Sequence, residues 1–580
     1  MTPIHERLKG LAFFRQLDSA AVETIARRGV WFSLAGGWDL FRQNTYSQTL
    51  FFVLSGRLVV VREGAGGEEV IGYVRAGEPV GEMSLLSGEP HSATVYALRD
   101  TELLALPRAD FEAVLEESAD FASALARAVL LRSRHPTTSL RSSSPRVFAL
   151  IATSPSIDVE ARARRIAREV ERYGFKTKLL GEEDADHVFY SFEAQENAHD
   201  VLLLQARIAD TPWYRFVLRH ADRFFVFARR DARPERPFEL SPAENSPAQR
   251  FRLVDLVMID EGMRAASVAE WVEAIGANRI FHWRREDCLG RLARVICGRS
   301  IGLVLSGGGA RAYAHIGVAR AMREKGLPID FVCGASMGGI VGACIAMGWS
   351  KEEIDARITD AFVSSNPLGD HVLPVVALTK GALVEERLAR HFSDTLIEEL
   401  EIPFFCVSSD LVRGAACVHR MGSLRKALRA SISLPGILPP VVEAGALLVD
   451  GAVINNFPTR MMTAMHRGMT IGVDVAEEAT IRVEDFVQPG GFFAWVRRNG
   501  LRAAPPIISL LMRAATTRDE SERRVHPADL MITPIVAGVE LRDWKKYDVA
   551  VEDGYRAALA AFEARWSELG PIAEVACAAS

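Results

Sequence analysis

The chain has 580 residues, which is too long for one hydrophobic core and predicts three or four domains. With 49% hydrophobic and 25% charged residues, its composition is that of a soluble globular protein. The formal net charge is −5, so no basic surplus points to nucleic acid as a partner.

The seven cysteines are scattered and form no Cys-x-x-Cys pair, which argues against a disulfide framework or a zinc site and favours a reducing cytoplasm. No His, Cys or carboxylate cluster has metal-ligand spacing, and we expect no metal. The first residues lack the apolar core of a secretory signal. Residues 331–350 are uncharged over the length of a membrane span, but five glycines and a preceding strand favour a buried strand–turn–helix. We therefore expect a cytoplasmic protein, at most peripheral at the inner membrane face.

Residues 1–131 begin with helical spacing of apolar residues and continue with short alternating segments such as TLFFVLSGRLVVVRE. Glycine-containing turns separate these segments at regular intervals, which is typical of a small β-barrel or jelly roll. A helical segment closes the domain. Residues 132–145 are rich in Ser, Thr, Pro and Arg and are predicted to form a linker.

Residues 146–299 begin with a nearly continuous apolar strand, RVFALIATS, which an amphipathic helix follows. Further buried-strand candidates alternate with helical pieces, and this alternation predicts a parallel, Rossmann-like α/β layer. The first turn after a strand, ATSPSID, lacks the glycine fingerprint of dinucleotide-binding domains. We interpret this domain as a structural or regulatory spacer.

The third α/β region, residues 300–580, opens with a strand, three glycines and an amphipathic helix in IGLVLSGGGARAYAHIGVARAMREKG. Gly307, Gly308 and Gly309 allow a sharp turn that points N–H groups into open space at a helix N-terminus, which makes an anion site. The anion is either a phosphate or the oxyanion of acyl transfer, and the loop alone does not decide. Arg311 stands between alanines where a P-loop requires Gly-Lys-Ser/Thr, which disfavours a nucleotide triphosphatase.

A G-x-S-x-G motif, Gly334-Ala335-Ser336-Met337-Gly338, follows 25 residues later, between an apolar strand and a helix of small residues. This is the context that a nucleophile elbow requires, because the flanking glycines permit a strained turn that lifts the hydroxyl of Ser336 above the sheet. A serine hydroxyl is a poor nucleophile without a base. Asp450 ends the apolar strand in EAGALLVDGAVINNFP and is the candidate partner; the alternative is a turn-forming Asp-Gly pair.

The ordered motifs SGGGAR, GASMGG, ALRASISLPGILPPV and DGAVINN resemble those of the patatin-like phospholipases over about residues 300–465. The resemblance implies an α/β/α hydrolase with a Ser336–Asp450 dyad. It also implies an oxyanion hole made by Gly307, Gly308 and Gly309, with Arg311 beside them. The rival arrangement is a Ser-His-Asp triad, for which His315, His466 and His526 are the available histidines.

Residues 490–518 mix aromatic and aliphatic residues with several arginines, which suits either a membrane-facing or lid helix or an ordinary packed helical hairpin.

Residues 10–130 resemble a cyclic-nucleotide-binding domain in LFFVLSGRLVVV and AGEPVGEMSLLSGEPHSATVYAL. The resemblance implies that Gly81 and Glu82 bind the ribose of a cyclic nucleotide, the regulatory ligand of that family. The family's phosphate-binding arginine is replaced by His91, which is mostly neutral at pH 7 and lacks the bidentate fork of arginine. The sequence therefore leaves open another ligand or a purely structural barrel.

The three domains in this order resemble a bacterial relative of neuropathy target esterase. The resemblance implies hydrolysis of phospholipids or lysophospholipids at an acyl ester, with no cofactor required and with peripheral membrane contact. Two alternatives remain open: a ligand sensor with a silent patatin scaffold, and an esterase for soluble esters. The head group, the acyl position and the oligomeric state do not follow from the sequence.

Overall fold

The computed structural model describes residues 4–64, 67–134, 145–234, 253–260, 267–284, 286–364, 366–373, 375–475 and 527–577. By contacts between residues, the chain forms two compact units, Met1–Ile280 and Phe281–Ser580. The boundary falls inside a strand, whereas the sequence placed it between residues 299 and 300. The helix before residue 300 packs with the second unit, since Arg294 of that helix pairs with the buried Asp330 at 2.7 Å.

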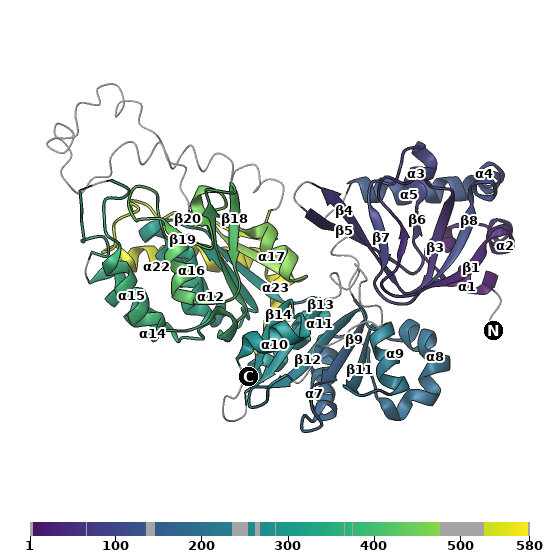
Figure 1. Ribbon diagram of the computed structural model, residues 1–580, viewed down its shortest axis with the longest axis horizontal. Helices are drawn as coiled ribbons and strands as arrows, with labels where there is room; N and C mark the ends of the chain where they lie inside the picture. The colour runs from purple at the N-terminus through teal and green to yellow at the C-terminus, as the bar shows by residue number, and fades with distance from the viewer. Residues whose placement is uncertain are drawn as a thin grey trace. The chain divides into compact units, whose positions relative to one another are not determined.

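The N-terminal domain is a jelly roll of two antiparallel sheets, with strand orders β1-β8-β3-β6 and β2-β7-β4-β5 in the described residues (Figure 1). Apolar residues alternate between two cores: Val53, Leu58 and Leu103 are buried between the sheets, whereas Leu50, Phe52 and Leu104 are buried under the flanking helices. The predicted barrel is therefore confirmed. Its strands are β1 (Val30–Leu34), β2 (Asp39–Phe41), β3 (Thr49–Ser55), β4 (Arg57–Gly64), β5 (Gly67–Arg75), β6 (Pro79–Val80), β7 (Thr94–Ala97) and β8 (Thr101–Pro107).

Helices flank the barrel at both ends of its sequence. Asp18 caps the second of them by accepting a hydrogen bond from the N–H of Ala21 at 2.6 Å. The last helix extends to Arg134, past the predicted start of the linker, and residues 135–144 lie outside the described residues. The helices are α1 (Ile4–Gly10), α2 (Ser19–Arg28), α3 (Glu82–Ser87), α4 (Arg108–Glu117) and α5 (Ala119–Arg134).

The second domain is the expected α/β layer, with strand order β10-β11-β9-β12-β13-β14. The pairings of β9 through β13 are parallel, and residues 147–152 are buried on both faces because helices cover the sheet. The strands are β9 (Val147–Ala152), β10 (Thr177–Leu180), β11 (Val201–Arg207), β12 (Arg223–Arg229), β13 (Leu253–Ile259) and β14 (Arg279–Trp283). The helices are α7 (Val159–Arg172), α8 (Ala185–Ala198), α9 (Pro212–His220) and α10 (Val268–Ile275).

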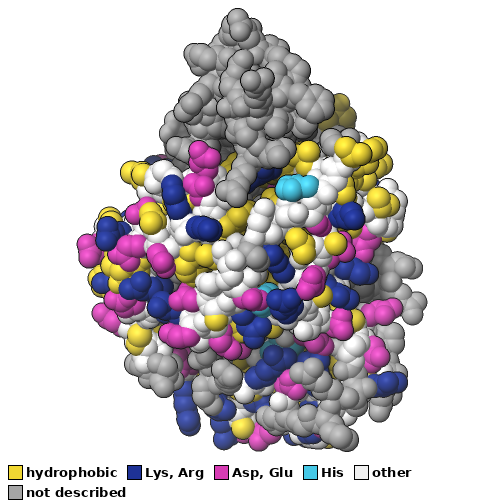
Figure 2. All heavy atoms as spheres, turned by 90° about the vertical axis from the view of Figure 1, so that its left-hand side faces the viewer, with side chains coloured by type: hydrophobic (Ala, Val, Ile, Leu, Met, Phe, Trp, Pro, Cys, Tyr) yellow, Lys and Arg dark blue, Asp and Glu magenta, His cyan; other side chains and the backbone are white. Residues whose placement is uncertain are grey.

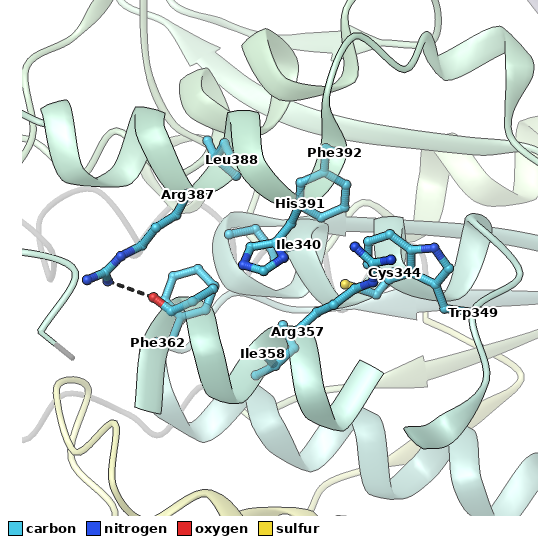
Figure 3. A pocket seen from close by; sticks show the side chains of 11 residues that line it. Ile340, Cys344, Trp349, Arg357, Ile358, Phe362, Arg387, Leu388, His391 and Phe392 are labelled. Carbon is cyan, nitrogen blue, oxygen red and sulfur yellow. Dashed lines mark hydrogen bonds between the residues drawn. The ribbon is translucent and has the colours of Figure 1, made fainter. Parts of the chain in front are cut away.

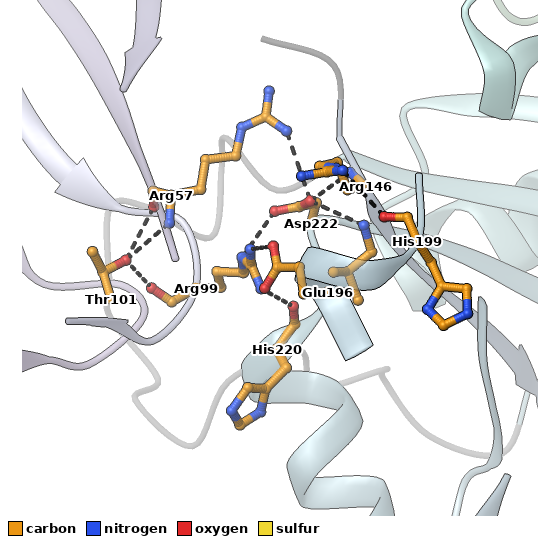
Figure 4. A network of polar contacts seen from close by, with 9 residues as sticks. Arg57, Arg99, Thr101, Arg146, Glu196, His199, His220 and Asp222 are labelled. Carbon is orange, nitrogen blue, oxygen red and sulfur yellow. Dashed lines mark hydrogen bonds and ion pairs between the residues drawn. The ribbon is translucent and has the colours of Figure 1, made fainter. Parts of the chain in front are cut away.

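A buried ion cluster joins the barrel to this layer (Figure 4). Arg99 of the barrel pairs with Asp222 at 3.0 Å and with Glu196, and it donates to the carbonyl of His220 at 3.1 Å. Arg57 lies 3.8 Å from the same Asp222 carboxylate. Both arginine side chains are 4% exposed and that of Asp222 is 2% exposed, so each charge depends on its partners rather than on water.

The second unit is built on a mixed sheet of order β19-β20-β17-β16-β15-β21-β22, with β18 paired to β17. Strands β15, β16, β17, β21 and β22 run parallel, whereas β18 and β20 are antiparallel to β17. The strands are β15 (Ile301–Leu305), β16 (Phe331–Ala335), β17 (Phe404–Asp410), β18 (Ala415–His419), β19 (Val441–Glu443), β20 (Ala446–Asp450), β21 (Met469–Val473) and β22 (Leu530–Ile532).

Helices cover this sheet and complete the expected hydrolase layers (Figure 1). Helices α12 and α22 cross where Gly317 and Gly554 face the backbone of the opposite helix, so the two axes approach closely. The helices are α11 (Glu286–Cys297), α12 (Ala314–Glu324), α13 (Ser336–Ala346), α14 (Lys351–Ile358), α15 (Ala382–Phe392), α16 (Leu424–Ser431), α17 (Thr459–Met465), α22 (Tyr547–Ala564) and α23 (Trp566–Cys577).

Candidate active site

Ser336 stands at the sharp turn between β16 and α13, as the G-x-S-x-G motif predicts. Its φ is +52°, a strained value for a residue with a side chain. A methyl group at Gly334 would lie 2.5 Å from the backbone of Gly338, and one at Gly338 would lie 2.4 Å from the carbonyl of Ser306, so the turn requires glycine at both positions. The N–H of Ser336 donates to the hydroxyl of Ser431 at 3.0 Å, which fixes the elbow to α16.

Asp450 meets Ser336 at the end of β20. The Ser336 hydroxyl donates to its Oδ2 at 2.7 Å, and the N–H of Ala452 donates to its Oδ1 at 2.9 Å. The backbone N–H of Asp450 donates to the carbonyl of Ser433 at 2.9 Å. The structure therefore brings the two residues predicted from the sequence into direct contact, 114 positions apart in the chain.

The Asp450 carboxyl group is 2% exposed, and burial raises its pKa from 3.8 to about 6. The hydrogen bonds from Ala452 and Ser336 act in the opposite direction, because they stabilise the ionised form. A carboxylate with a pKa near 6 is ionised at neutral pH and is a better proton acceptor than an ordinary aspartate.

The glycine loop lies against the elbow. A methyl group added at Gly307 would lie 2.9 Å from Cβ of Ser336, so only glycine fits there. Gly309 has a φ of +57° and packs on the carbonyl of Leu541, which also accepts the N–H of Ala310 at 3.0 Å. Within the described residues, the N–H groups of Gly308 and Gly309 donate to no other group. These two amides are therefore available for an oxyanion.

The amide of Gly307 is already engaged, which the sequence did not foresee. It donates to Oδ1 of Asn456 at 3.0 Å, and Nδ2 of Asn456 lies 3.4 Å from the carbonyl of Gly307. Of the three glycine amides predicted for an oxyanion hole, those of Gly308 and Gly309 are thus without another acceptor in the described residues. Arg311 also points elsewhere, since its Nε donates to the carbonyl of Val539 at 2.8 Å.

Buried polar side chains hold the loop from behind. Nε2 of His315 lies 2.8 Å from the carbonyl of Ser306, and because a carbonyl only accepts, this nitrogen carries the proton. Burial lowers the pKa of His315 to about 4, so the ring is neutral. The hydroxyl of Ser306 accepts the N–H of Val475 at 2.9 Å. Both peptide groups that precede Gly308 therefore have fixed orientations.

The histidines considered for a triad do not reach the dyad. His466 lies 3.2 Å from the hydroxyl of Ser300, at the opposite end of β15 from the glycine loop. His315 is engaged by a backbone carbonyl, and His526 lies outside the described residues. In the described part of the chain, no histidine hydrogen-bonds to Ser336 or Asp450, which favours the dyad.

A small, mainly apolar pocket of about 10 Å³ lies further along α13 (Figure 3). Its lining includes Ile340 and Cys344 of α13, but neither Ser336 nor Asp450. Arg387 closes one side by donating to the carbonyl of Ala361 at 2.6 Å. The pocket is therefore a small gap between packed helices and does not include Ser336.

The predicted nucleotide-binding residues of the barrel are present but engaged. Gly81 has a φ of +90° and precedes α3, whose first residue, Glu82, is 2% exposed. Arg132 of α5 pairs with Glu82 at 2.5 Å. His91 is 7% exposed and stacks on Phe41 with ring centroids 3.8 Å apart. Burial lowers the pKa of His91, so its ring does not supply the charge of the missing arginine.

Comparisons with known proteins match a protein family to the N-terminal barrel and another to the region that contains Ser336 and Asp450. The family described as Patatin-like phospholipase matches residues 303–463, and the Cyclic nucleotide-binding domain family matches residues 32–118. An uncharacterized NTE family protein of Mycobacterium tuberculosis is 31% identical, with 97% of each chain covered. The chain belongs to the NTE family. This confirms the resemblance to the relatives of neuropathy target esterase.

Other members of the NTE family are longer. Patatin-like phospholipase domain-containing protein 6 of Homo sapiens is 28% identical over 84% of this chain, and the match covers 40% of the human protein. The chain therefore spans less than half of that relative. The crystal structure of Thermus thermophilus catabolite activator protein is 26% identical, with 28% of this chain and 68% of that chain covered and a TM-score of 0.21.

The sequence raised two questions about membrane segments in this NTE-family chain, at residues 331–350 and at residues 490–518, and the structure describes the first of these segments. Residues 331–350 begin as β16 and α13, so the apolar stretch is the expected strand–turn–helix. In the ranges that the structure describes, no helix combines the length and the apolar character needed to cross a bilayer. The segment 490–518 lies outside those ranges.

Proposed function

We propose that this chain is a serine hydrolase that cleaves fatty-acyl esters of phospholipids and lysophospholipids through Ser336 and Asp450. The observation that carries the proposal is the 2.7 Å hydrogen bond from the Ser336 hydroxyl to a buried carboxylate, beside two unengaged glycine amides. Membership of a patatin-like phospholipase family supports a lipid ester as the substrate class.

In the proposed reaction, Asp450 takes the proton of the Ser336 hydroxyl while Oγ attacks the acyl carbon. The carbonyl oxygen becomes an oxyanion held by the amides of Gly308 and Gly309. Collapse of this intermediate breaks the ester bond, and Asp450 returns the proton to the departing alcohol oxygen. A water molecule then repeats the sequence on the acyl-serine: Asp450 accepts a water proton, and Ser336 leaves with that proton as the fatty acid is released.

The direct test is release of fatty acid from lysophosphatidylcholine by the wild-type chain, Ser336→Ala and Asp450→Ala. We expect both variants to lose at least about 10³-fold in kcat/KM, because each removes a component of one catalytic unit. His466→Ala is the matched control and should retain activity. Activity retained by Ser336→Ala would contradict the proposal, and loss in His466→Ala with retention in Asp450→Ala would favour a triad.

The proposal includes peripheral contact with a membrane, since phospholipid substrates lie in bilayers. It also includes a regulatory role for the barrel, for which a cyclic nucleotide is the first ligand to test. A ribose that binds Glu82 has to displace Arg132. Thermal-shift titrations with cyclic AMP and cyclic GMP on the wild-type chain and Arg132→Ala are therefore expected to show a larger stabilisation in the variant. No shift in either protein would favour a barrel without this ligand.

A further inference from the structure

A hairpin in the hydrolase unit holds aliphatic side chains out in water. Its described residues are 371–373 and 375–379, and Leu373, Val375 and Val376 near its tip are 91%, 94% and 63% exposed. The hairpin is ordered by its own backbone: His371 bridges Thr379, and the N–H of Val372 donates to the carbonyl of Leu378 at 3.0 Å. Its apolar tip is therefore presented by a fixed framework.

This hairpin is braced against the segment that supports the dyad. Leu378 donates its N–H to the carbonyl of Gly436 at 2.9 Å, and the hydroxyl of Thr379 donates to the carbonyl of Ile437 at 2.7 Å. A few residues earlier in the same segment, Ser431 accepts the N–H of Ser336 and Ser433 accepts that of Asp450. The hairpin and the dyad therefore share one short stretch of chain, residues 431–437.

A second group of exposed aliphatic side chains lies where that stretch continues. Val442 of β19 is 75% exposed, and at the turn after β17 Leu411 and Val412 are 48% and 67% exposed. The N–H of Leu411 donates to the carbonyl of Leu447 at 3.0 Å, which joins this turn to the β19–β20 hairpin. Because β16 and β17 are parallel, the turn after β17 lies at the same sheet edge as Ser336.

Basic side chains accompany these apolar ones. Lys380 is exposed at the base of the hairpin, and Arg413 follows Val412 with its side chain 67% exposed while it pairs with Asp410. Glu443 is exposed beside Val442 and Asp410 pairs with Arg413, so these charges balance and apolar contact is the main attraction to a membrane. Figure 2 shows this side of the molecule, where apolar side chains reach the surface among both basic and acidic ones.

We propose that these six aliphatic side chains form a docking surface that inserts into the interfacial layer of a phospholipid bilayer: Leu373, Val375, Val376, Leu411, Val412 and Val442. The inference rests on the proposed function, because it assigns the place where a bilayer lipid reaches Ser336. Exposed aliphatic groups on a hydrogen-bonded hairpin and on neighbouring turns, at the sheet edge that holds Ser336, match the apolar interfacial layer of a membrane without a charge barrier.

The test uses the full chain with vesicles of mixed phosphatidylcholine and phosphatidylglycerol. The variant Leu373→Asp/Val375→Asp/Val376→Asp is expected to lose at least about tenfold in sedimentation with vesicles and in hydrolysis of their lipid. Its turnover of a water-soluble short-chain ester should be unchanged. Val549→Asp, at a site on α22 that is 49% exposed, is the control and should behave as wild type.

Each result separates docking from catalysis. Unchanged vesicle sedimentation in the triple variant would overturn the docking surface. Loss of soluble-ester turnover in both this variant and the milder Leu373→Ser/Val375→Ser/Val376→Ser would overturn it too, because the hairpin would then act on the dyad itself. A wild-type dimer that the triple variant converts to monomers would assign the surface to a second copy instead. Absence of ester hydrolysis in the wild-type chain, with vesicle binding that depends on the hairpin, would contradict the proposed function alone.

Discussion

Asp450→Asn is expected to stabilise the hydrolase unit at neutral pH while it abolishes turnover. In the wild type, burial raises the pKa of Asp450 from 3.8 to about 6. The folded chain therefore holds more protons than the unfolded chain between these two values, and stability falls as the pH rises through this window. Above pH 6, the buried charge costs about 3 kcal/mol of the free energy of unfolding. Asparagine is neutral and nearly isosteric, so it removes that penalty.

The amide of asparagine also preserves the local contacts. Its oxygen can accept the N–H of Ala452, as Oδ1 of Asp450 does at 2.9 Å, and its NH₂ group can donate to the Ser336 oxygen. We therefore expect a gain of about 2–3 kcal/mol near pH 8 and almost none near pH 4. Catalysis disappears because an amide accepts no proton at neutral pH. In the wild type, kcat/KM should rise with pH through about 6 and then level off.

Cysteine labelling in urea measures the stability of this unit selectively. All seven cysteines of the sequence lie at position 288 or later, and Cys333, Cys344 and Cys406 are buried. Their reactivity therefore reports unfolding of the hydrolase unit and is insensitive to the barrel. Equal or lower stability of Asp450→Asn near pH 8 would refute the reasoning, since it would mean that the native site stabilises the carboxylate. Asp394→Asn, at an ion pair whose carboxylate is 93% exposed, is the control and should gain nothing.

Three further substitutions test the supports described above. Asn456→Ala should lower kcat about 10²-fold with little change in KM, because Gly307 loses the side chain that holds its amide. Asn456→Asp keeps the acceptor oxygen, so its kcat should lie between those of the wild type and Asn456→Ala. Equal kcat in all three enzymes, measured on a soluble ester, would contradict this role. Gly309→Ala should lose activity and about 1–2 kcal/mol of stability in a urea titration, because its φ is +57° and the methyl group meets a carbonyl; a neutral effect would show that the loop adapts. Asp222→Ala should destabilise the first unit by about 3–5 kcal/mol, because the buried arginines Arg57 and Arg99 lose the carboxylate that they share. A melting temperature like that of wild type would show that water reaches the cluster.

The sequence was sufficient for features that local pattern determines. Alternation of apolar residues predicted the barrel, and buried apolar runs predicted the strands of both α/β layers. The elbow at Ser336 followed from its glycines and its position between strand and helix. Asp450 was predicted from its position at a strand end and from family motifs, and the structure places it in contact with Ser336.

What the sequence missed depends on contacts between distant positions. Asn456 clamps Gly307 from 149 residues away, and the only hint was a polar pair after the Asp450 strand. Arg132 binds Glu82 although its position was predicted to begin a linker, because composition does not show that α5 continues to Arg134. The ion pair between Arg294 and Asp330 also joins distant positions, and it attaches the helix before residue 300 to the hydrolase unit.

The pairing of Arg132 with Glu82 has a consequence for how the barrel communicates with the rest of the chain. Arg132 lies near the last residue of α5, so a ligand that occupies Glu82 has to free the end of the helix from which the chain leaves the barrel. Ligand binding at Glu82 and docking of the end of α5 then exclude each other. By thermodynamic reciprocity, an interaction that stabilises docked α5 lowers the affinity for the ligand by the same factor by which the ligand weakens that interaction. A pull on the chain after α5 and the concentration of the ligand would then shift the same equilibrium, the one between docked and released α5.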